Sequence, residues 1–291
     1  MNVAQMIDRL RQDGDFRWNL TAWKTLPPRP ARYGDYPPEV LPELREGLAR
    51  RGIMNLYSHQ AEAVGAVFRG ENVCVVTPTA SGKTLCYNLP VLNRLLVNPN
   101  ARALYLFPTK ALGQDQVKEL TSTIQTLDVK IGTYTFDGDT PSNARKAVRN
   151  AGHIVVTNPD MLHAGILPHH TIWIRLFENL EFVVIDEIHH YRGVFGSHLA
   201  NVVRRLKRIC AFYGSHPQFI CCSATIANPK EMAEKIIEAP VHLVDDNGAP
   251  AGEKHFLFYN PPVVNAELGI RASSVKRASQ LAAHLLSRDI Q

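Results

Sequence analysis

The sequence predicts an α/β fold with a mostly parallel, doubly wound sheet and helices on both of its faces. Three observations support this prediction. Short segments rich in Val, Ile, Leu and Phe alternate with amphipathic segments long enough to form crossover helices. One apolar segment runs directly into a Gly-Lys-Thr triplet at residues 82–84, and a later one runs into the acidic pair Asp186-Glu187.

The expected elements follow from hydrophobic periodicity and from helix start and stop signals. Helices are expected near residues 3–12 and over 39–51, 58–69 and 83–96. For the helix over 58–69, Ser58 is the expected N-cap and Gly70 the expected stop. Strands are expected at 72–76, 103–107, 131–135, 153–157, 182–186, 218–223 and 241–244. A last helical stretch is expected from Ser273 to Arg288.

The chain divides by composition into three parts. Residues 1–38 are expected to form an N-terminal extension, because residues 27–38 carry five prolines and favour an extended strap. Trp18 and Trp23 lie beside this strap and are expected to anchor it on the core, with base stacking as the alternative. Residues 39–250 are expected to form the nucleotide-binding domain, and 251–291 a linker and the start of a further domain.

Composition limits the class of protein. The apolar fraction of 45% and charged fraction of 20% are those of an ordinary globular protein. No apolar run approaches the length of a membrane span, so a membrane is not expected as a partner. The net charge of +5 favours a polyanionic partner without establishing one. The five cysteines show no zinc-ligand spacing and are expected to be core residues in a reducing cytoplasm. The spacing of the 12 histidines does not favour a metal site.

The segment at 77–84 has the ingredients of a phosphate-binding loop. It reads Thr77-Pro78-Thr79-Ala80-Ser81-Gly82-Lys83-Thr84. The glycine allows close backbone approach, the lysine suits the β- and γ-phosphates, and the threonine hydroxyl suits Mg²⁺. The strict pattern asks for glycine where Thr77 stands, and a Gly-Lys-Thr triplet alone also occurs in ordinary surface turns. The preceding strand, the following helix and the distant acidic pair favour an ATP site.

The acidic pair supplies what the loop lacks. Asp186, at the end of a buried strand, is expected to hold the Mg²⁺ shell, and Glu187 to position or polarise the attacking water. The alternative for Glu187 is a supporting role near the metal without direct water activation.

Four further segments carry a resemblance to a known family: 56–60 with its Gln60, 107–112 followed by Gln114 and Gln116, 157–162, and 223–225. With them, the chain from about residue 39 to 260 resembles the first RecA-like domain of superfamily 2 DExH-box helicases. Residues 186–198 and 136–141 are similar to those of bacterial MrfA/YprA-type helicases, relatives of the fungal Hrq group that are implicated in DNA repair.

The resemblance implies ATP and Mg²⁺ as cofactors and a role for each motif. Gln60 would read the adenine edge, residues 77–84 would hold the phosphates, and Lys83, Asp186 and Glu187 would be catalytic. Coupling between nucleotide and nucleic acid would involve His189, Ser223, Ala224 and Thr225. Contacts with nucleic acid would involve Thr109, Lys110, Thr157, Asn158 and Arg192.

The function expected from this resemblance is that of the ATP-binding part of an ATP-dependent DNA helicase or translocase acting in repair. Its expected partners are nucleic acid, with single-stranded DNA favoured, and a second RecA-like domain of the same polypeptide that supplies an arginine finger. Four alternatives remain open at this point: the motor of a restriction or nuclease complex, an RNA helicase, a small-molecule kinase and a non-catalytic binding module.

Overall fold

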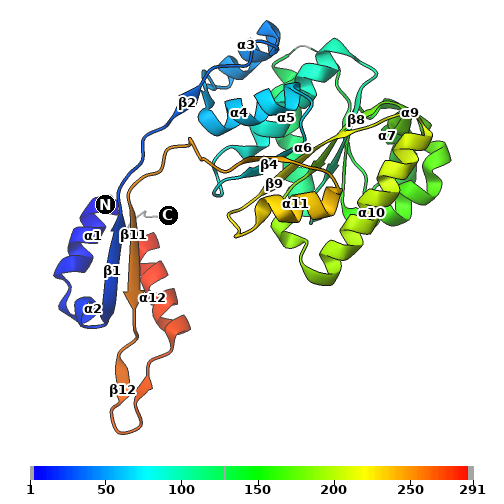
Figure 1. Ribbon diagram of the computed structural model, residues 1–291. Coiled ribbons are helices and arrows are strands. Elements are labelled where there is room, and N and C mark those ends of the chain that lie inside the picture. The colour runs from blue at the N-terminus through cyan, green and yellow to red at the C-terminus, as the bar shows by residue number, and fades with distance from the viewer. Residues whose placement is uncertain (1–2, 128, 288–291) are drawn as a thin grey trace. The chain divides into compact units, whose positions relative to one another are not determined.

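The computed structural model describes residues 3–127 and 129–287, which form two units. Unit 1 combines the described residues up to Pro30 with those from Ala251 onward, and unit 2 is Ala31–Pro250 (Figure 1). From the sequence, 1–38 and 251–291 are expected to be separate segments. The structure instead pairs their strands, so that the two segments share one unit.

Unit 2 is built on a seven-stranded parallel sheet with the strand order β10-β4-β9-β8-β5-β7-β6. Its strands are β4 (Val73–Val76), β5 (Arg102–Leu106), β6 (Thr133–Thr135), β7 (Ile154–Thr157), β8 (Leu180–Ile185), β9 (Gln218–Ser223) and β10 (His242–Val244). Every strand expected from the sequence in this unit is present, with ends that differ by at most two residues and with 218–223 matched at both ends. The predicted doubly wound α/β fold is therefore confirmed.

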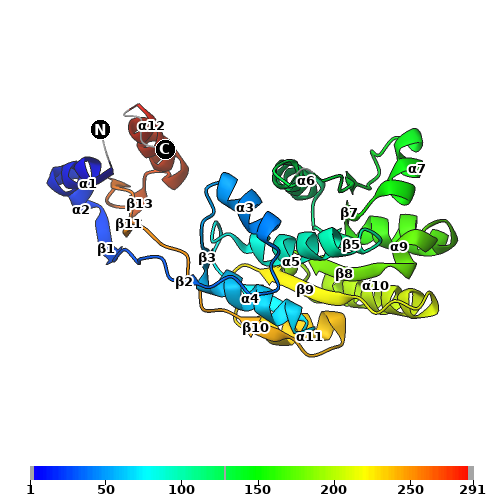
Figure 2. The ribbon, with the colours of Figure 1, turned by 90° about the horizontal axis from the view of Figure 1, so that it is seen from above.

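Helices cover both faces of this sheet, as Figure 2 shows from above. One face carries α3 (Pro42–Arg50), α4 (Ser58–Phe68), α5 (Lys83–Val97) and α6 (Lys110–Gln125). The other carries α7 (Ser142–Ala151), α9 (Ile174–Glu178), α10 (Gly193–Phe212) and α11 (Pro229–Ile237). The connection after β7 contains the short α8 (Pro159–Met161), a π-helical turn (Leu162–Ile166) and a 3₁₀ segment (Leu167–Ile172), and another 3₁₀ turn (Ile188–His190) follows β8.

Alternate residues of each strand enter different cores. In β4, Val73 and Val75 pack under α4 and α5, whereas Cys74 and Val76 pack on the face that carries α10 and α11. This explains the continuous apolar strands in the sequence, because both faces of each strand must be buried. All carboxyl ends of the parallel strands meet at one edge, where ligands bind in open α/β sheets.

The start of α4 differs from the expectation. Ser58 is the first helical residue and Tyr57 the N-cap, because the backbone N–H of Tyr57 donates to the Gln60 side chain at 2.9 Å. Tyr57 also belongs to β3 (Leu56–Tyr57), which pairs with β2 (Tyr33–Gly34) of the proline-rich segment. Gly70 ends the helical region with φ of +81°, as expected.

Unit 1 is organised around the antiparallel pair of β1 (Leu20–Leu26) and β11 (Lys254–Tyr259). Its other elements are α1 (Val3–Gln12), α2 (Gly14–Trp18), β12 (Val263–Asn265), β13 (Ile270–Arg271) and α12 (Ser274–Leu286). The last expected helix is thus present, although Arg288 lies outside the described residues. None of the helices in 3–127 and 129–287 combines the length and apolar character that a membrane crossing requires.

The expectation for the two tryptophans is wrong. Trp18 is 89% exposed, and the Trp23 indole N–H donates to His255 Nδ1 at 3.1 Å within unit 1. Arg11 also lies over the Trp23 ring. Trp23 therefore stabilises the pairing of β1 with β11 in its own unit. Its partner in this contact, His255, lies 232 residues away in the sequence.

Candidate functional site

The loop between β4 and α5 has the backbone of a phosphate cradle. Ala80 and Gly82 both adopt left-handed φ angles, +61° and +80°. A Cβ atom on Gly82 would lie 2.6 Å from the Gln60 amide nitrogen and would displace that side chain, and the positive φ itself favours glycine there. Inside the loop, the hydroxyls of Thr77 and Ser81 share a hydrogen bond of 2.6 Å.

Lys83 is held by the loop itself. Its ammonium group donates to the carbonyl oxygens of Thr77 at 2.8 Å and Pro78 at 3.1 Å. Thr77 is fully buried, so this predicted ligand residue contributes its carbonyl to Lys83 and has no side-chain surface for a nucleotide. A phosphate group would offer the ammonium a stronger acceptor than these two carbonyls.

The acidic pair follows β8. Asp186 is 8% exposed, and its Oδ1 accepts the backbone N–H of Glu187 at 2.8 Å while its Oδ2 lies 3.1 Å from the Tyr87 hydroxyl. Burial raises the pKa of Asp186 to about 6. Glu187 has a left-handed φ of +51°, an uncommon conformation for a residue with a side chain. Strain of this kind is concentrated at functional sites in proteins.

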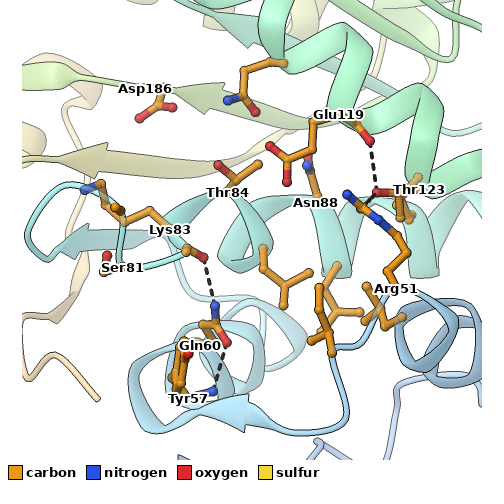
Figure 3. A pocket seen from close by; sticks show the side chains of 18 of the residues that line it. Arg51, Tyr57, Gln60, Ser81, Lys83, Thr84, Asn88, Glu119, Thr123 and Asp186 are labelled. Atoms are coloured by element: carbon orange, nitrogen blue, oxygen red, sulfur yellow. Dashed lines mark hydrogen bonds between the residues drawn. The ribbon is translucent and has the colours of Figure 1, made fainter. Parts of the chain in front are cut away.

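One cavity of about 810 Å³ brings these groups together (Figure 3). Its wall includes Lys83 and Thr84 from the start of α5, Asp186 and Glu187 from the end of β8, and Gln60 from α4. Four of the remaining predicted loop residues, Thr79, Ala80, Ser81 and Gly82, also line it, whereas Thr77 and Pro78 do not. The cavity continues past Asn88 to a polar end formed by Arg51, Glu119 and Thr123.

Gln60 is already engaged within the protein. It is 4% exposed, its amide oxygen accepts from the Tyr57 N–H, and its Nε2 donates to the Gly82 carbonyl at 2.9 Å. Both bonds are visible beside the phosphate loop in Figure 3. The predicted pairing with an adenine edge therefore requires Gln60 to exchange at least one of these partners. Gln60 in the present structure fixes the glycine of the loop to the start of α4.

The predicted coupling residues meet behind the acidic pair. The backbone N–H of Ala224 donates to His189 Nδ1 at 3.2 Å, so His189 reaches this motif through its backbone rather than through the Ser223 or Thr225 side chains. The same Nδ1 lies 3.1 Å from Glu187 Oε2. A neutral ring nitrogen that accepts from Ala224 cannot also donate to Glu187, and burial lowers the pKa of His189 and so favours the neutral form. Nδ1 therefore has two competing partners, one in each motif.

Four of the predicted nucleic-acid residues gather at the ends of β5 and β7. Thr109, Lys110, Thr157 and Asn158 line one small cavity. Thr109 caps α6 by accepting from Leu112 N–H at 3.4 Å, and Asn158 caps α8 by accepting from Met161 N–H at 2.8 Å.

The other side chains of this group are also paired. Lys110 donates to Asp139 at 2.5 Å, and the Thr157 hydroxyl donates to the Phe136 carbonyl at 2.5 Å. Arg192 lies elsewhere, in a cavity of about 700 Å³ that also includes Thr225. The structure thus brings four of the five predicted contacts together and separates the fifth.

Two buried residues near the site have no functional signal in the sequence. Tyr87 lies in an apolar stretch of α5, where an aromatic residue ordinarily indicates core packing. His59 lies beside Gln60 in the segment 56–60, is fully buried, and accepts from the Gly248 N–H at 3.2 Å. Both roles depend on partners that are distant in the sequence.

Comparisons with known proteins agree with the fold and the motifs. The family model described as DEAD/DEAH box helicase matches residues 57–232. The chain is 56% identical over 273 residues to the uncharacterized ATP-dependent helicase YprA of Bacillus subtilis, covering 94% of this chain and 36% of that protein. It is 37% identical over 295 residues to the ATP-dependent helicase HRQ1 of Saccharomyces cerevisiae, covering 99% of this chain and 27% of that protein.

A solved structure gives the same result in three dimensions. The crystal structure of DUF1998 helicase MrfA bound to DNA superposes with a TM-score of 0.95 at 54% identity, covering 100% of this chain and 38% of that one. The chain therefore spans well under half the length of the relatives it matches. The predicted RecA-like fold and the predicted resemblance are confirmed. The chain belongs to the DEAD/DEAH box helicase family and is similar to its MrfA/YprA-type and Hrq members.

Proposed function

We propose that this chain is the ATP-binding domain of an ATP-dependent DNA helicase or translocase that acts in DNA repair. One observation carries the proposal: Lys83, Thr84, Asp186 and Glu187 line a single cavity at the carboxyl edge of the sheet. These are the groups that phosphoryl transfer from ATP to water requires, namely a cation for the phosphates, two oxygen groups for the metal and a carboxylate for the water.

The side chains fit Mg²⁺ bound together with a nucleotide. Mg²⁺ keeps several waters and takes one or two carboxylates plus substrate phosphates. Thr84 and Asp186 would hold it, and Asp186 is already oriented by bonds to both carboxylate oxygens. When bound, the metal would neutralise charge on the phosphates. Because Mg²⁺ favours the ionised carboxylate, its binding would oppose the effect of burial on the pKa of Asp186.

The chain's own residues then have distinct tasks. Lys83 would leave the Thr77 and Pro78 carbonyls and turn its ammonium group to the phosphates. Glu187 would orient the attacking water and accept its proton. His189, which lies between Glu187 and Ala224, would report that event to the segment Ser223-Ala224-Thr225. We propose these roles together as the coupling between ATP hydrolysis and movement on nucleic acid.

For nucleic acid we propose single-stranded DNA, gripped through its phosphates by Thr109, Lys110, Thr157 and Asn158. Hydroxyls, amides and a lysine at the N-terminal ends of helices suit phosphate oxygens and carry no sequence preference. The MrfA relative was crystallised bound to DNA, which supports DNA for this chain. Lys110 would exchange Asp139 for a phosphate. We assign Arg192 to a separate contact, with the nucleic-acid backbone or a neighbouring domain.

We further propose a second RecA-like domain of the same polypeptide as a partner. It would close over ATP and contribute an arginine finger, without which turnover would be roughly 10³–10⁵-fold slower. We place the protein in the cytoplasm, where a reducing environment suits the five free cysteines of the described residues, all of which are buried. An RNA helicase and the motor of a nuclease complex are the alternatives that share this site.

The test is ATP turnover by the polypeptide extended through its second RecA-like domain, without nucleic acid and with single-stranded DNA or RNA. Stimulation by DNA is expected, and Glu187→Gln should lower the stimulated rate by about 10²–10⁴-fold. Glu253→Gln, an exposed carboxylate of unit 1, is the matched control and should leave the rate unchanged. Stimulation by RNA alone would replace DNA by RNA as the substrate. Fast turnover that needs neither would contradict a motor.

A further inference from the structure

A buried tyrosine contacts Asp186, one of the two residues proposed to hold the metal. Tyr87 lies one turn into α5 and is fully buried. Its hydroxyl donates to Asp186 Oδ2 at 3.1 Å. A third polar group, the side-chain amide of Gln116 on α6, lies 3.0 Å away. A polar cluster therefore connects three elements behind the phosphate loop: α5, α6 and the end of β8.

The number of available protons determines the direction of the hydrogen bonds in this cluster. A phenol carries a single proton, so Tyr87 cannot donate to Asp186 and to the Gln116 amide oxygen at once. The charged carboxylate is the stronger acceptor. If the proton goes to Asp186, Gln116 satisfies the phenol oxygen by presenting its Nε2–H, which requires only a half turn of the amide that exchanges its two end atoms. The bonds then run from Gln116 to Tyr87 to Asp186, and each donor has one acceptor.

We propose that Tyr87 is a positioning residue for Asp186 and that Gln116 holds the Tyr87 hydroxyl in the donating orientation. The Glu187 backbone N–H fixes one oxygen of the Asp186 carboxylate, and the phenol fixes the other. A carboxylate held at both oxygens cannot rotate, which prepares it for the octahedral shell that Mg²⁺ demands. This inference rests on the proposed ATP site and adds two residues to it.

The position of Gln116 gives the arrangement a second consequence. Gln116 lies six residues after Lys110 on α6, which places it about 9 Å along the helix from the proposed phosphate contacts. A shift of α6 on binding nucleic acid would therefore move the amide that orients Tyr87. The first two turns of α6 therefore connect the proposed nucleic-acid contacts with the metal site through a single helix.

A neighbouring tyrosine provides a matched control. Tyr105 on β5 is equally buried and packs edge to face on the Tyr87 ring at 5.4 Å. Its hydroxyl donates to Asn88 at 3.0 Å and not to Asp186. Tyr87→Phe and Tyr105→Phe each remove one buried hydroxyl from the same core, but only the first removes a bond to the metal site.

The experiment is a Mg²⁺ titration of nucleotide binding, followed with a fluorescent ATP analogue added first in excess EDTA. Tyr87→Phe is expected to raise the Mg²⁺ concentration at half-maximal binding about tenfold, the usual size of one charge-assisted hydrogen bond, and to leave the affinity in EDTA unchanged. Tyr105→Phe should match the native protein in both. Gln116→Met should shift the midpoint in the same direction as Tyr87→Phe, but by less.

Two outcomes would overturn the inference. In one, Tyr87→Phe and Tyr105→Phe give the same Mg²⁺ midpoint; in the other, Tyr87→Phe weakens binding equally with and without Mg²⁺, as a packing defect would. Thermal unfolding of each variant identifies any loss of folded protein. Failure of the native protein to bind the nucleotide at all would instead remove the proposed function, so the two failures are distinguishable.

Discussion

Units 1 and 2 bury their strands in different ways. In unit 2 every residue of β4, β5 and β7 is buried, and the sheet has a core on each face. In unit 1, β11 alternates between exposed and half-buried residues, and α12 has no buried residue. Among the described residues of unit 1, the buried apolar side chains are Met6 and Leu10.

The difference separates local from distant determinants of structure. A strand that is buried on both faces is recognised in the sequence by a continuous apolar run, and its partner strands are recognised in the same way. The pairing of β1 with β11 instead joins segments more than 200 residues apart, with Leu20 opposite Tyr259. Unit 2 carries the proposed chemistry on a rigid sheet, whereas unit 1 presents exposed apolar residues such as Phe256 and Phe258.

The largest expected contrast in stability is between truncations in the two units. Leu104→Ala in the buried β5 should lower the free energy of unfolding by about 2–5 kcal/mol, because it removes packing and leaves a cavity. Phe258→Ala, at a side chain that is 56% exposed, should change it by less than about 1 kcal/mol.

Tryptophan fluorescence during urea unfolding can follow each unit separately. Trp173 is buried in unit 2, and Trp18 and Trp23 lie in unit 1. Replacing Trp18 and Trp23 by Phe leaves Trp173 to report on unit 2, the context in which Leu104→Ala is measured. Replacing Trp173 instead leaves the tryptophans of unit 1, the context for Phe258→Ala. Equal losses for the two truncations would contradict the difference in core structure.

A second effect concerns acid sensitivity in unit 2. Burial, with a further contribution from Lys83, lowers the pKa of His59 from 6.5 to about 4. Between these values the unfolded chain binds more protons than the folded chain, so stability increases with pH. As pH falls from about 6.5 to about 4, unit 2 should lose on the order of 3 kcal/mol from this group.

The control for this prediction is His59→Gln, which has no titrating ring. Burial also lowers the pKa of His153, which contributes in the same direction and is unchanged in both proteins. The difference between the two pH profiles, measured by urea unfolding with Trp173 as the probe, therefore isolates His59. Parallel profiles would show that the pKa of His59 does not differ between the folded and unfolded states, contrary to what its burial implies.

The sequence could predict the features that depend on local residues, and could not predict those that depend on distant contacts. The strands of unit 2, the phosphate loop and the acidic pair were predictable because each is encoded within about ten consecutive residues. The internal bonds of Gln60, the role of Tyr87 and the partner of Trp23 were not, because each depends on a contact made by the folded chain. The left-handed backbone of Glu187 is likewise imposed by its surroundings, since glutamate itself disfavours it.

The smallest predicted effect compares left-handed residues in the two units. Ala80 in the phosphate loop has φ of +61°, whereas in the part of unit 1 that the structure describes the left-handed residue is Gly269 at +63°. Ala80→Gly should raise the free energy of unfolding by about 0.5–1 kcal/mol through relief of strain, and Gly269→Ala should lower it by a similar amount. A Cβ at Gly269 meets no atom within 4 Å, so its effect is conformational only. Urea unfolding measures both. The strained conformation falls on an alanine in the phosphate loop of unit 2 but on a glycine, which tolerates it, in unit 1. We therefore expect the strain at Ala80 to preorganise the phosphate loop, so that Ala80→Gly should also weaken nucleotide binding. A variant that is more stable and binds as tightly as the native protein would show that the strain has no such role.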